Sequence, residues 1–221
     1  MLAVLYDIHG NLPALQAVLA EVDREGVDRY LLGGDYGTPS PWPHETLAQL
    51  RELPNAVWIR GNGERWLREP PYDRPEVMEM YEHFRSGLSD DEMDELYALP
   101  EQAEIDGVLY VHGSPLSDVE SFAPEPQPEE ERMLAGVGGR TIVFGHSHQQ
   151  FRRAGPAGTD LVNPGSVGMP LDGDVRAAWA TWDGDFEFRR TAYDVERAAG
   201  AYEKMPGAGE LFAGRIRRGL D

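Results

Sequence analysis

Four of the six histidines in this 221-residue chain follow apolar, strand-like runs directly or two residues later: His9, His112, His146 and His148. Imidazole nitrogen is a common ligand of transition metals in proteins. On an extended backbone residues two apart point the same way, so His146 and His148 face one site if the strand continues past Gly145. We therefore predict that residues 141–148 form a buried strand that delivers metal ligands to a pocket. The alternative is a pair of exposed loop histidines.

Five predicted strands end in polar side chains of the kinds that bind metals. The strands are expected at residues 2–6, 30–32, 57–59, 108–111 and 141–148. The polar residues at their carboxyl ends or shortly after them are Asp7, His9, Asp35, Asn62, His112, His146 and His148. In open α/β sheets ligands bind beyond the carboxyl ends of the strands, so these side chains are expected to share one crevice.

Seven ligands are too many for one tetrahedral site, but they match two metal ions that share a carboxylate. The chain has no cysteine, so thiolate ligands and cysteine nucleophiles are excluded. Mixed oxygen and imidazole donors suit Mn, Fe, Co, Ni or Zn better than Mg or Ca, and we favour manganese among these. Two ions about 3.5 to 4 Å apart can hold a bridging hydroxide for an in-line displacement at phosphorus. Phosphate ester hydrolysis fits this chemistry.

The elements that would position these residues begin with a βαβ unit. Helices are predicted over residues 12–25, 45–53, 75–86, 90–99, 129–135, 195–204 and 209–218, with another beginning near Glu64. Residues 103–105 and 108–111 form a predicted hairpin around the turn dipeptide Asp106-Gly107, and residues 176–182 and 186–191 form another around Asp183-Gly184. A strand over 159–162 leads into a turn-rich segment, 163–168. An α/β fold is therefore expected.

The composition of the chain limits the kinds of partner that it is expected to bind. Asp and Glu number 39 against 20 Lys and Arg, for a net charge of −19, so stable binding to nucleic acid or to anionic membranes is not expected. The apolar opening is too short for a signal-peptide core or a membrane span, so we expect a cytoplasmic protein. No flexible linker divides the chain, and we predict one domain over 1–221 with a helical excursion at about 70–100. Whether the chain forms a homo-oligomer is left open.

The order of the short motifs resembles the calcineurin-like metallophosphoesterase superfamily, and its small bacterial and archaeal phosphodiesterase branch most. The motifs are Asp-x-His-Gly-Asn (7–11), Gly-Asp (34–35), Gly-Asn-x-Glu (61–64), Val-His-Gly-Ser-Pro (111–115), Gly-His-Ser-His (145–148) and Asn-Pro-Gly-Ser (163–166). The resemblance implies a four-layer α/β/β/α sandwich with two central mixed β-sheets flanked by helices. It also implies one metal held by Asp7, His9, Asp35 and His148, and a second held by Asp35, Asn62, His112 and His146.

The resemblance further implies that Asn62 contacts the phosphate, with help from Asn11. Asn11 has an alternative role at the entry of a helix, and Arg60 binds either a phosphate or a surface acid. Glu64 is expected as a first-turn helix residue, favourably placed against the helix dipole, and less as a catalytic acid. The segment 163–168 is expected to buttress the metal loops.

One position departs from the pattern. Many members of the superfamily carry a histidine or aspartate after the Gly-Asn, where a histidine can protonate the leaving group, and this chain has Gly63. Substrates with leaving groups of low pKa, such as aryl phosphodiesters and nucleotide anhydrides, are therefore predicted to react far better than alkyl monoesters. Alternatively, the glycine opens room for a bulkier substrate.

These observations together predict a binuclear-metal phosphoesterase for small phosphate esters, phosphodiesters or nucleotide-type substrates above all. A metal-bridging hydroxide would attack phosphorus, with Asp35 and Asn62 as the catalytic residues. The alternative from another class is a non-catalytic protein-interaction scaffold on the same fold. Loss of ligands would be its expected sign, and this chain retains all seven.

Overall fold

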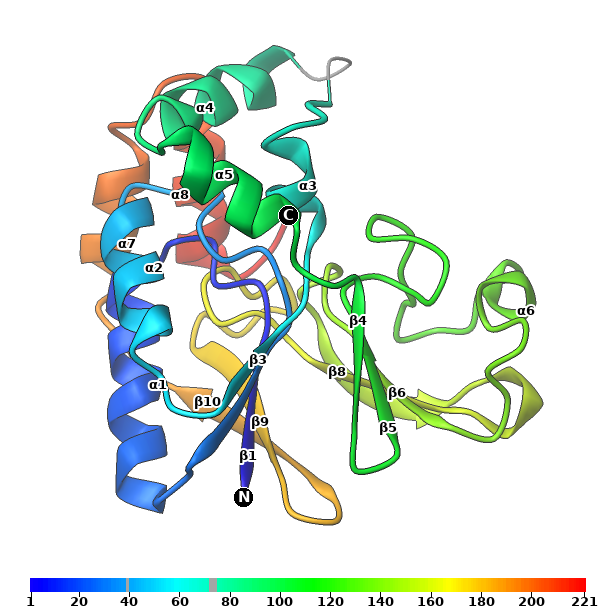
Figure 1. Ribbon diagram of the computed structural model, residues 1–221. Helices are drawn as coiled ribbons and strands as arrows, with labels where there is room; N and C mark the ends of the chain where they lie inside the picture. The colour runs from blue at the N-terminus through cyan, green and yellow to red at the C-terminus, as the bar shows by residue number, and fades with distance from the viewer. Residues whose placement is uncertain (39, 72–74) are drawn as a thin grey trace.

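A computed structural model describes residues 1–38, 40–71 and 75–221 of the chain. The expected helical excursion at about 70–100 contains residues outside this described part. Ten strands form two five-stranded sheets that lie face to face (Figure 1). The order in the first sheet is β10 (Phe186–Thr191), β9 (Ala177–Trp182), β1 (Leu2–Leu5), β2 (Arg29–Leu32) and β3 (Ala56–Trp58). The order in the second sheet is β4 (Gln102–Ile105), β5 (Val108–Val111), β6 (Thr141–Val143), β8 (Asp160–Pro164) and β7 (Gln150–Ala154).

Both sheets are mixed, and each contains three parallel strands. Strands β1, β2 and β3 are parallel in the first sheet, as are β5, β6 and β8 in the second. Antiparallel pairing adds β9 and β10 to the first sheet, and β4 and β7 to the second. Each parallel set therefore presents its carboxyl ends along one edge, where the predicted ligands follow.

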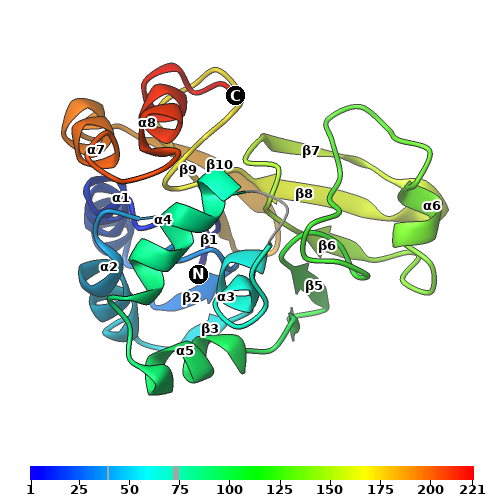
Figure 2. The ribbon, with the colours of Figure 1, turned by 90° about the horizontal axis from the view of Figure 1, so that it is seen from above.

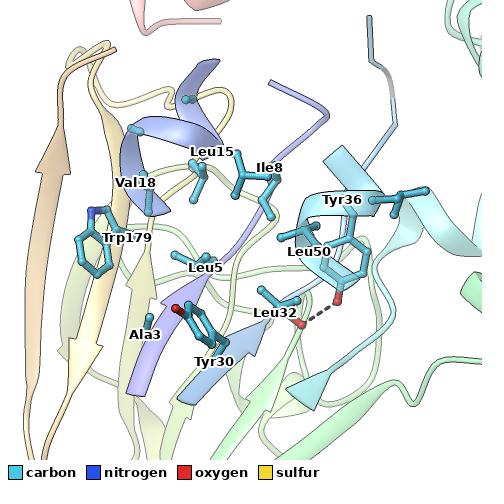
Figure 3. Packing of buried hydrophobic residues seen from close by; sticks show 14 of the residues in the cluster. Ala3, Leu5, Ile8, Leu15, Val18, Tyr30, Leu32, Tyr36, Leu50 and Trp179 are labelled. Atoms are coloured by element: carbon cyan, nitrogen blue, oxygen red, sulfur yellow. Dashed lines mark hydrogen bonds between the residues drawn. The ribbon is translucent and has the colours of Figure 1, made fainter. Parts of the chain in front are cut away.

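The alternation of side chains along β1 places apolar residues on both faces of the first sheet. Leu2 and Val4 belong to a buried cluster that also contains Tyr110 and Val162 from the second sheet, so this cluster fills the space between the sheets. Ala3, Leu5 and their neighbours pack instead against helices on the outer face, as Figure 3 shows. A strand buried on both faces reads as a continuous apolar run, which is why the short segment Leu2–Leu5 was recognisable in the sequence.

Helices cover the outer face of the first sheet and the edge that carries the ligands (Figure 2). They are α1 (Leu12–Glu25), α2 (Pro43–Arg51), α3 (Asn62–Trp66), α4 (Pro75–Arg85), α5 (Asp90–Tyr97), α7 (Val195–Tyr202) and α8 (Gly209–Arg218). Helix α1 begins after Asn11, whose side chain accepts a hydrogen bond from the Ala14 N–H, and ends at Gly26 in the left-handed conformation. Phe84 of α4 and Met93 of α5 belong to the same apolar cluster as the first sheet.

The outer layer of the second sheet is thinner. It contains α6 (Glu130–Met133), a single turn, and the short 3₁₀ turn η1 (Pro156–Gly158). Phe122 and Met133 pack with Ile142 and Phe144 in the cluster beneath this layer. The four-layer α/β/β/α class predicted from the sequence is confirmed, with a fourth layer made largely of loop.

Two local predictions were wrong, and one strand was missed. Strand β6 ends at Val143, so the extended backbone does not reach the two histidines as expected. The helix predicted over 129–135 is only the turn α6. Strand β7 was not predicted, because its sequence Gln-Phe-Arg-Arg-Ala has the charged composition of an edge strand. No helix in the described ranges has both the length and the apolar character needed to cross a bilayer.

Candidate metal centre

Five of the predicted ligands have an unusual backbone conformation. Asp7, His9, Asp35, His146 and His148 have φ between 49° and 62°, in the left-handed region, and they are five of the eight such non-glycine residues in the described part of the chain. Asp and His tolerate this region better than most residues, but it is still uncommon. Backbone strain of this kind concentrates at functional sites, where the surrounding structure holds it in place. Left-handed turns, not a continued strand, therefore aim these side chains.

Backbone hydrogen bonds hold the turns after β1 and β2 together. The N–H of Asp7 donates to the carbonyl of Gly34 (3.2 Å), and that of His9 donates to the carbonyl of Asp35 (2.8 Å). Gly10 continues the series with a bond to the Tyr36 carbonyl (2.7 Å). The pairing of the two strands thus extends beyond the sheet and fixes the backbone beside both carboxylates.

A buried carboxylate, Glu64, fixes a third segment to the same place. Its Oε2 accepts the N–H groups of Asp35 and Gly61, both at 2.9 Å, and its Oε1 accepts the N–H of Tyr36 at 2.9 Å. Glu64 lies in the first turn of α3 as predicted. Burial raises the pKa of Glu64 while these N–H groups oppose the rise. The sequence signal for this role was the Gly-Asn-x-Glu spacing, but the partners are long-range and could not be inferred from it.

Three histidines are oriented by backbone carbonyls. The Nδ1 atoms of His9, His112 and His148 lie 2.5, 2.8 and 2.8 Å from the carbonyl oxygens of Thr38, Gly33 and Met169. Because a carbonyl only accepts, each Nδ1 carries the proton and each Nε2 presents a lone pair. All three Nε2 atoms face Asp7, and those of His9 and His112 also face Asp35.

The carboxylates lie between these imidazoles. Asp7 Oδ1 is 3.5 Å from Nε2 of His148 and 3.9 Å from Nε2 of both His9 and His112. Asp35 uses both of its oxygens: Oδ2 is 3.9 Å from His9 Nε2, and Oδ1 is 3.6 Å from His112 Nε2. One group, Asp7 with His9 and His148, and another, Asp7 with Asp35 and His112, each bring their ligand atoms within 4.8 Å of one another. Either aspartate thus faces both groups.

Two observations show that this set fits a cation. Asp7 Oδ1 is completely buried and has no hydrogen-bond partner among the described residues. The Nε2 atoms of His9 and His148 are only 3.0 Å apart, although the carbonyl contacts leave both of them with lone pairs. A buried anion without a partner and two lone pairs that face each other each raise the free energy of the folded protein. A divalent ion that bound Asp7 Oδ1 and the Nε2 atoms of His9 and His148 would remove both costs. The described residues therefore include buried Asp and His groups that could hold metal.

Asn62 and His146 lie on the side of His112. One tip of the Asn62 amide lies 3.1 Å from His112 Nε2 and 2.9 Å from His146 Nδ1. The N–H of His146 donates to Asp7 Oδ2 at 2.9 Å. His146 is half-buried and belongs to neither ligand group. The structure thus brings all seven predicted ligands to one place, with His146 at the margin.

The electrostatics separate the two aspartates. Burial opposes the charge of Asp7, but the imidazoles around it, His148 foremost, outweigh burial and hold its pKa well below the ordinary value. Burial raises the pKa of Asp35 to about 7, and the carboxylates of Glu64 and Asp7 add to that rise. Without a cation, therefore, one carboxylate is firmly ionised and the other resists ionisation.

The histidines divide in a similar way. Burial, together with neighbouring imidazoles, lowers the pKa of His9 to about 3 and that of His146 to about 4. Burial also acts against the charge of His112, but the carboxylates of Asp35 and Asp7 outweigh it and raise the pKa. His9 and His146 are thus neutral near pH 7, which is the form that binds metal.

The other two predicted substrate contacts, Asn11 and Arg60, are differently placed. Asn11 is completely buried, with Oδ1 capping α1 and Nδ2 donating to the Gly168 carbonyl at 2.7 Å. Arg60 donates to the Tyr97 carbonyl (2.9 Å) and to Glu101 (2.5 Å). It also lines a cavity of about 220 Å³ beside His112 and Ser114. The contacts of Asn11 favour its helix-entry role, whereas Arg60 borders a space that a substrate can enter.

Several residues support the ligand loops from outside. Ser166 donates to the Asp7 carbonyl (2.7 Å), and Asn163 donates to the Gly145 carbonyl (3.2 Å), which agrees with the buttressing predicted for 163–168. The Tyr202 hydroxyl donates to the His9 carbonyl from helix α7. That contact had no sequence signal, because an isolated tyrosine in a C-terminal helix looks like any core aromatic.

The suggestion that Gly63 opens room for a bulkier substrate was wrong. A Cβ at this position would lie 2.2 Å from Thr38 Oγ1 and 2.8 Å from Asp35 Oδ1, so the space is already filled. The glycine N–H instead donates to Asp35 Oδ1 at 2.7 Å. Gly63 is thus required by close packing against the carboxylate.

Comparison with known proteins agrees with this geometry. The sequence model of the calcineurin-like phosphoesterase superfamily domain matches residues 1–185. The uncharacterized protein MJ0912 of Methanocaldococcus jannaschii is 27% identical over 236 residues, which cover 93% of this chain and 91% of that protein.

Solved structures share the fold. The metallophosphoesterase from Sphaerobacter thermophilus has a TM-score of 0.79 at 23% identity, with 99% of each chain covered. The hypothetical protein PH1004 from Pyrococcus horikoshii also has a TM-score of 0.79 at 23% identity, covering 96% of this chain and 98% of that one. A putative diadenosine tetraphosphatase has a TM-score of 0.57 at 18% identity, covering 86% and 93%. At these identities the likeness establishes the fold alone.

Proposed function

We propose that this chain, a phosphoesterase that belongs to the calcineurin-like phosphoesterase superfamily, uses two divalent metal ions to hydrolyse phosphodiesters or nucleotide-type esters. One observation supports this most strongly. The buried Asp7 Oδ1 has no hydrogen-bond partner among the described residues, and the Nε2 atoms of three histidines surround it within 3.9 Å. An anion so placed is stabilised by cations, and the second carboxylate, Asp35, faces both ligand groups.

Different residues would hold the two ions and the substrate. Asp7, His9, Asp35 and His148 would hold one ion, and Asp35, Asn62, His112 and His146 the other. When bound, such ions supply Lewis-acid charge at the phosphoryl oxygens and make a coordinated water acidic enough to react near neutral pH. Asn62, between His112 and His146, would also donate its amide to the substrate phosphate. Glu64 holds the backbone of Asp35 in place throughout.

The donor set favours particular ions and substrates. Imidazole and carboxylate together suit Mn, Fe, Co, Ni or Zn, and we propose manganese as the best activator. No histidine or aspartate stands at position 63 to protonate a leaving group. Aryl phosphodiesters and nucleotide anhydrides should therefore react much faster than alkyl monoesters, and diadenosine polyphosphates belong in the substrate panel. The cytoplasmic location remains a prediction.

The test is a metal-dependent assay on a chromogenic phosphodiester, bis(p-nitrophenyl) phosphate. Protein stripped with a chelator should be inactive, and manganese should restore activity more than magnesium or calcium does. His112→Ala should abolish hydrolysis, whereas His83→Ala, which changes an exposed histidine of α4, should leave it unchanged. Hydrolysis that survives His112→Ala would reveal a contaminant. Wild-type protein that remains inactive with every metal would contradict the proposal.

A further inference from the structure

Thr38, in the loop after β2, carries a buried hydroxyl that no described residue satisfies. The residue is 1% exposed, and its Oγ1 makes no hydrogen bond within the described part of the protein. Leaving a hydroxyl buried and unpaired costs roughly 1–3 kcal/mol, so such groups in native proteins call for an explanation. A partner that arrives from outside the chain is one.

The hydroxyl lies beside the candidate metal centre. It occupies the place that a side chain at Gly63 would take, since a Cβ there would be 2.2 Å from Thr38 Oγ1 and 2.8 Å from Asp35 Oδ1. The side chain at this corner of the site therefore comes from the loop after β2, not from α3. Thr38 is buried to the same degree as His112 (1% exposed) and Asp35 (3% exposed).

The same loop is tied to the site through its backbone. The Thr38 carbonyl accepts from Nδ1 of His9 at 2.5 Å, and Gly10 donates to the Tyr36 carbonyl at 2.7 Å. These contacts fix the position of Thr38 relative to the ligands without using its hydroxyl. A donor that is held rigidly and left unpaired is preorganised for a substrate oxygen.

Tyr81 is the other hydroxyl nearby. It projects from α4, is 2% exposed, and its ring packs edge-on against Trp66 with centroids 5.6 Å apart. Burial raises the pKa of Tyr81 well above its ordinary value, the Asp35 carboxylate raises it further, and the nearby Thr38 hydroxyl opposes the rise. The two hydroxyls are thus neighbours, although Thr38 Oγ1 has no partner with hydrogen-bond geometry among the described residues. The phenol stays protonated, and a test must distinguish its contribution from that of Thr38.

We propose that the Thr38 hydroxyl donates a hydrogen bond to an oxygen of the bound phosphate ester and so helps to position the phosphoryl group. The inference rests on the proposed function of the same site. Threonine does not ionise in the working pH range, so Thr38 aids binding and charge stabilisation and does not act as a proton donor to the leaving group.

The test compares Thr38→Val with two other variants in the manganese-loaded protein. Valine keeps the shape and removes only the hydroxyl, so kcat/KM for bis(p-nitrophenyl) phosphate should fall about 10- to 100-fold, while Thr38→Ser should retain most activity. Inorganic phosphate, measured by calorimetry, should bind to Thr38→Val about 3- to 10-fold more weakly. Thr46→Val is the matched control. Thr46 is also buried, and its hydroxyl has no hydrogen-bond partner among the residues that the structure describes, but it lies in α2 and not among the predicted ligands.

Stability separates this role from a structural one. Removing an unsatisfied hydroxyl should leave the melting temperature of the metal-free protein unchanged or raise it. A Thr38→Val protein that melts lower and binds phosphate normally would overturn the inference. So would a loss of phosphate affinity in Tyr81→Phe but not in Thr38→Val, which would assign the contact to Tyr81. If wild type binds phosphate but hydrolyses no ester, the proposed function fails while the phosphate titration still tests Thr38.

Discussion

The two sheets contribute to the metal centre in different ways. The first sheet supplies both carboxylates, Asp7 and Asp35, whereas the ligands from the second sheet are all imidazoles: His112, His146 and His148. The carboxylates lie in turns held by several internal hydrogen bonds. The second-sheet histidines depend on the first sheet in part, because His112 is oriented by the Gly33 carbonyl and the N–H of His146 donates to Asp7. The first sheet thus supplies the anionic part of the centre, the carboxylates of Asp7 and Asp35 with the backbone turns that hold them, which we call the frame. The second sheet completes the centre with imidazole donors.

The surroundings of the sheets fit this division. Seven helices lie over the first sheet and its ligand-bearing edge, whereas within the described residues the second sheet is covered on its outside by α6, η1 and loop segments (Figure 2). Strained left-handed turns persist only where surrounding contacts determine them. The frame of carboxylates is therefore expected to be set before any metal binds, and substitutions should have unequal effects on the two sides.

The largest expected effect concerns Asp7, whose Oδ1 belongs to both ligand groups. Asp7→Asn keeps the shape but removes the charge, and a loss of several kcal/mol of charge stabilisation corresponds to a fall in kcat/KM of about 10³-fold or more. His146→Asn should cost about 10- to 100-fold, because His146 is half-buried and belongs to neither group. Rates with manganese, together with circular dichroism to confirm folding, measure both. Equal losses would mean that the two sheets contribute alike.

The ionisation of Asp35 can be used to test the frame in metal-free protein. Its pKa is raised to about 7 from 3.8, so the folded state holds the proton more tightly than the unfolded state does. This group therefore favours folding most at low pH, and its contribution is lost as pH rises from about 4 through 7. Asp35→Asn has no such ionisation. In chelator, the stability of the variant relative to wild type should rise across this range, by up to about 4 kcal/mol at roughly 1.36 kcal/mol per pKa unit.

Urea unfolding at a series of pH values measures this difference. His9 and His146 act in the opposite direction, since their lowered pKa values make stability increase with pH up to about 6.5, but they are present in both proteins and largely cancel. Asp91→Asn, at an exposed position in α5, should show a flat difference. Saturating manganese should reverse the order, because the ions stabilise ionised Asp35. A flat curve for Asp35→Asn would show that the carboxylate is not desolvated.

The sequence revealed the ligands better than their geometry. Apolar runs that end in Asp, His or Asn marked the strand ends. Few residue types suit a strand that is buried on both faces, and few types of side chain bind metals, so both features can be recognised in a sequence. The left-handed turns at Asp7 and His148 were not foreseen, because they depend on hydrogen bonds between segments far apart in the chain. Strand β7 was missed because an edge strand need not be apolar. Nothing in the sequence pointed to Thr38. The proposed role of its hydroxyl depends on the absence of a hydrogen-bond partner among the described residues, which only the three-dimensional structure shows.

A substitution of Glu64 tests whether hydrogen bonds within the first-sheet half of the protein, and not the metal, hold the frame in place. Its two oxygens accept three backbone N–H groups, and a glutamine has only one acceptor oxygen and would turn its own amide toward an N–H donor. Glu64→Gln should lower the free energy of unfolding by about 2 kcal/mol, with or without metal, because charge-assisted hydrogen bonds are replaced by weaker or repulsive contacts. Glu45→Gln, at an exposed first-turn position in α2, should change it by less than about 0.5 kcal/mol. A Glu64→Gln protein as stable as the control would remove Glu64 from the frame.

The smallest expected effect tests how far the frame extends along the chain. Helix α7 lies beyond residue 185, where the match to the family model ends, and yet its Tyr202 hydroxyl donates to the carbonyl of His9. Tyr202→Phe keeps the ring packed and leaves that buried carbonyl unpaired, which should cost about 1 kcal/mol of stability and weaken manganese binding a few-fold. Tyr97→Phe, which removes a hydroxyl contact with Glu69 on the exterior, should leave manganese affinity unchanged. If Tyr202→Phe binds manganese like wild type, α7 only covers the first sheet, and the frame ends with the strands and their loops.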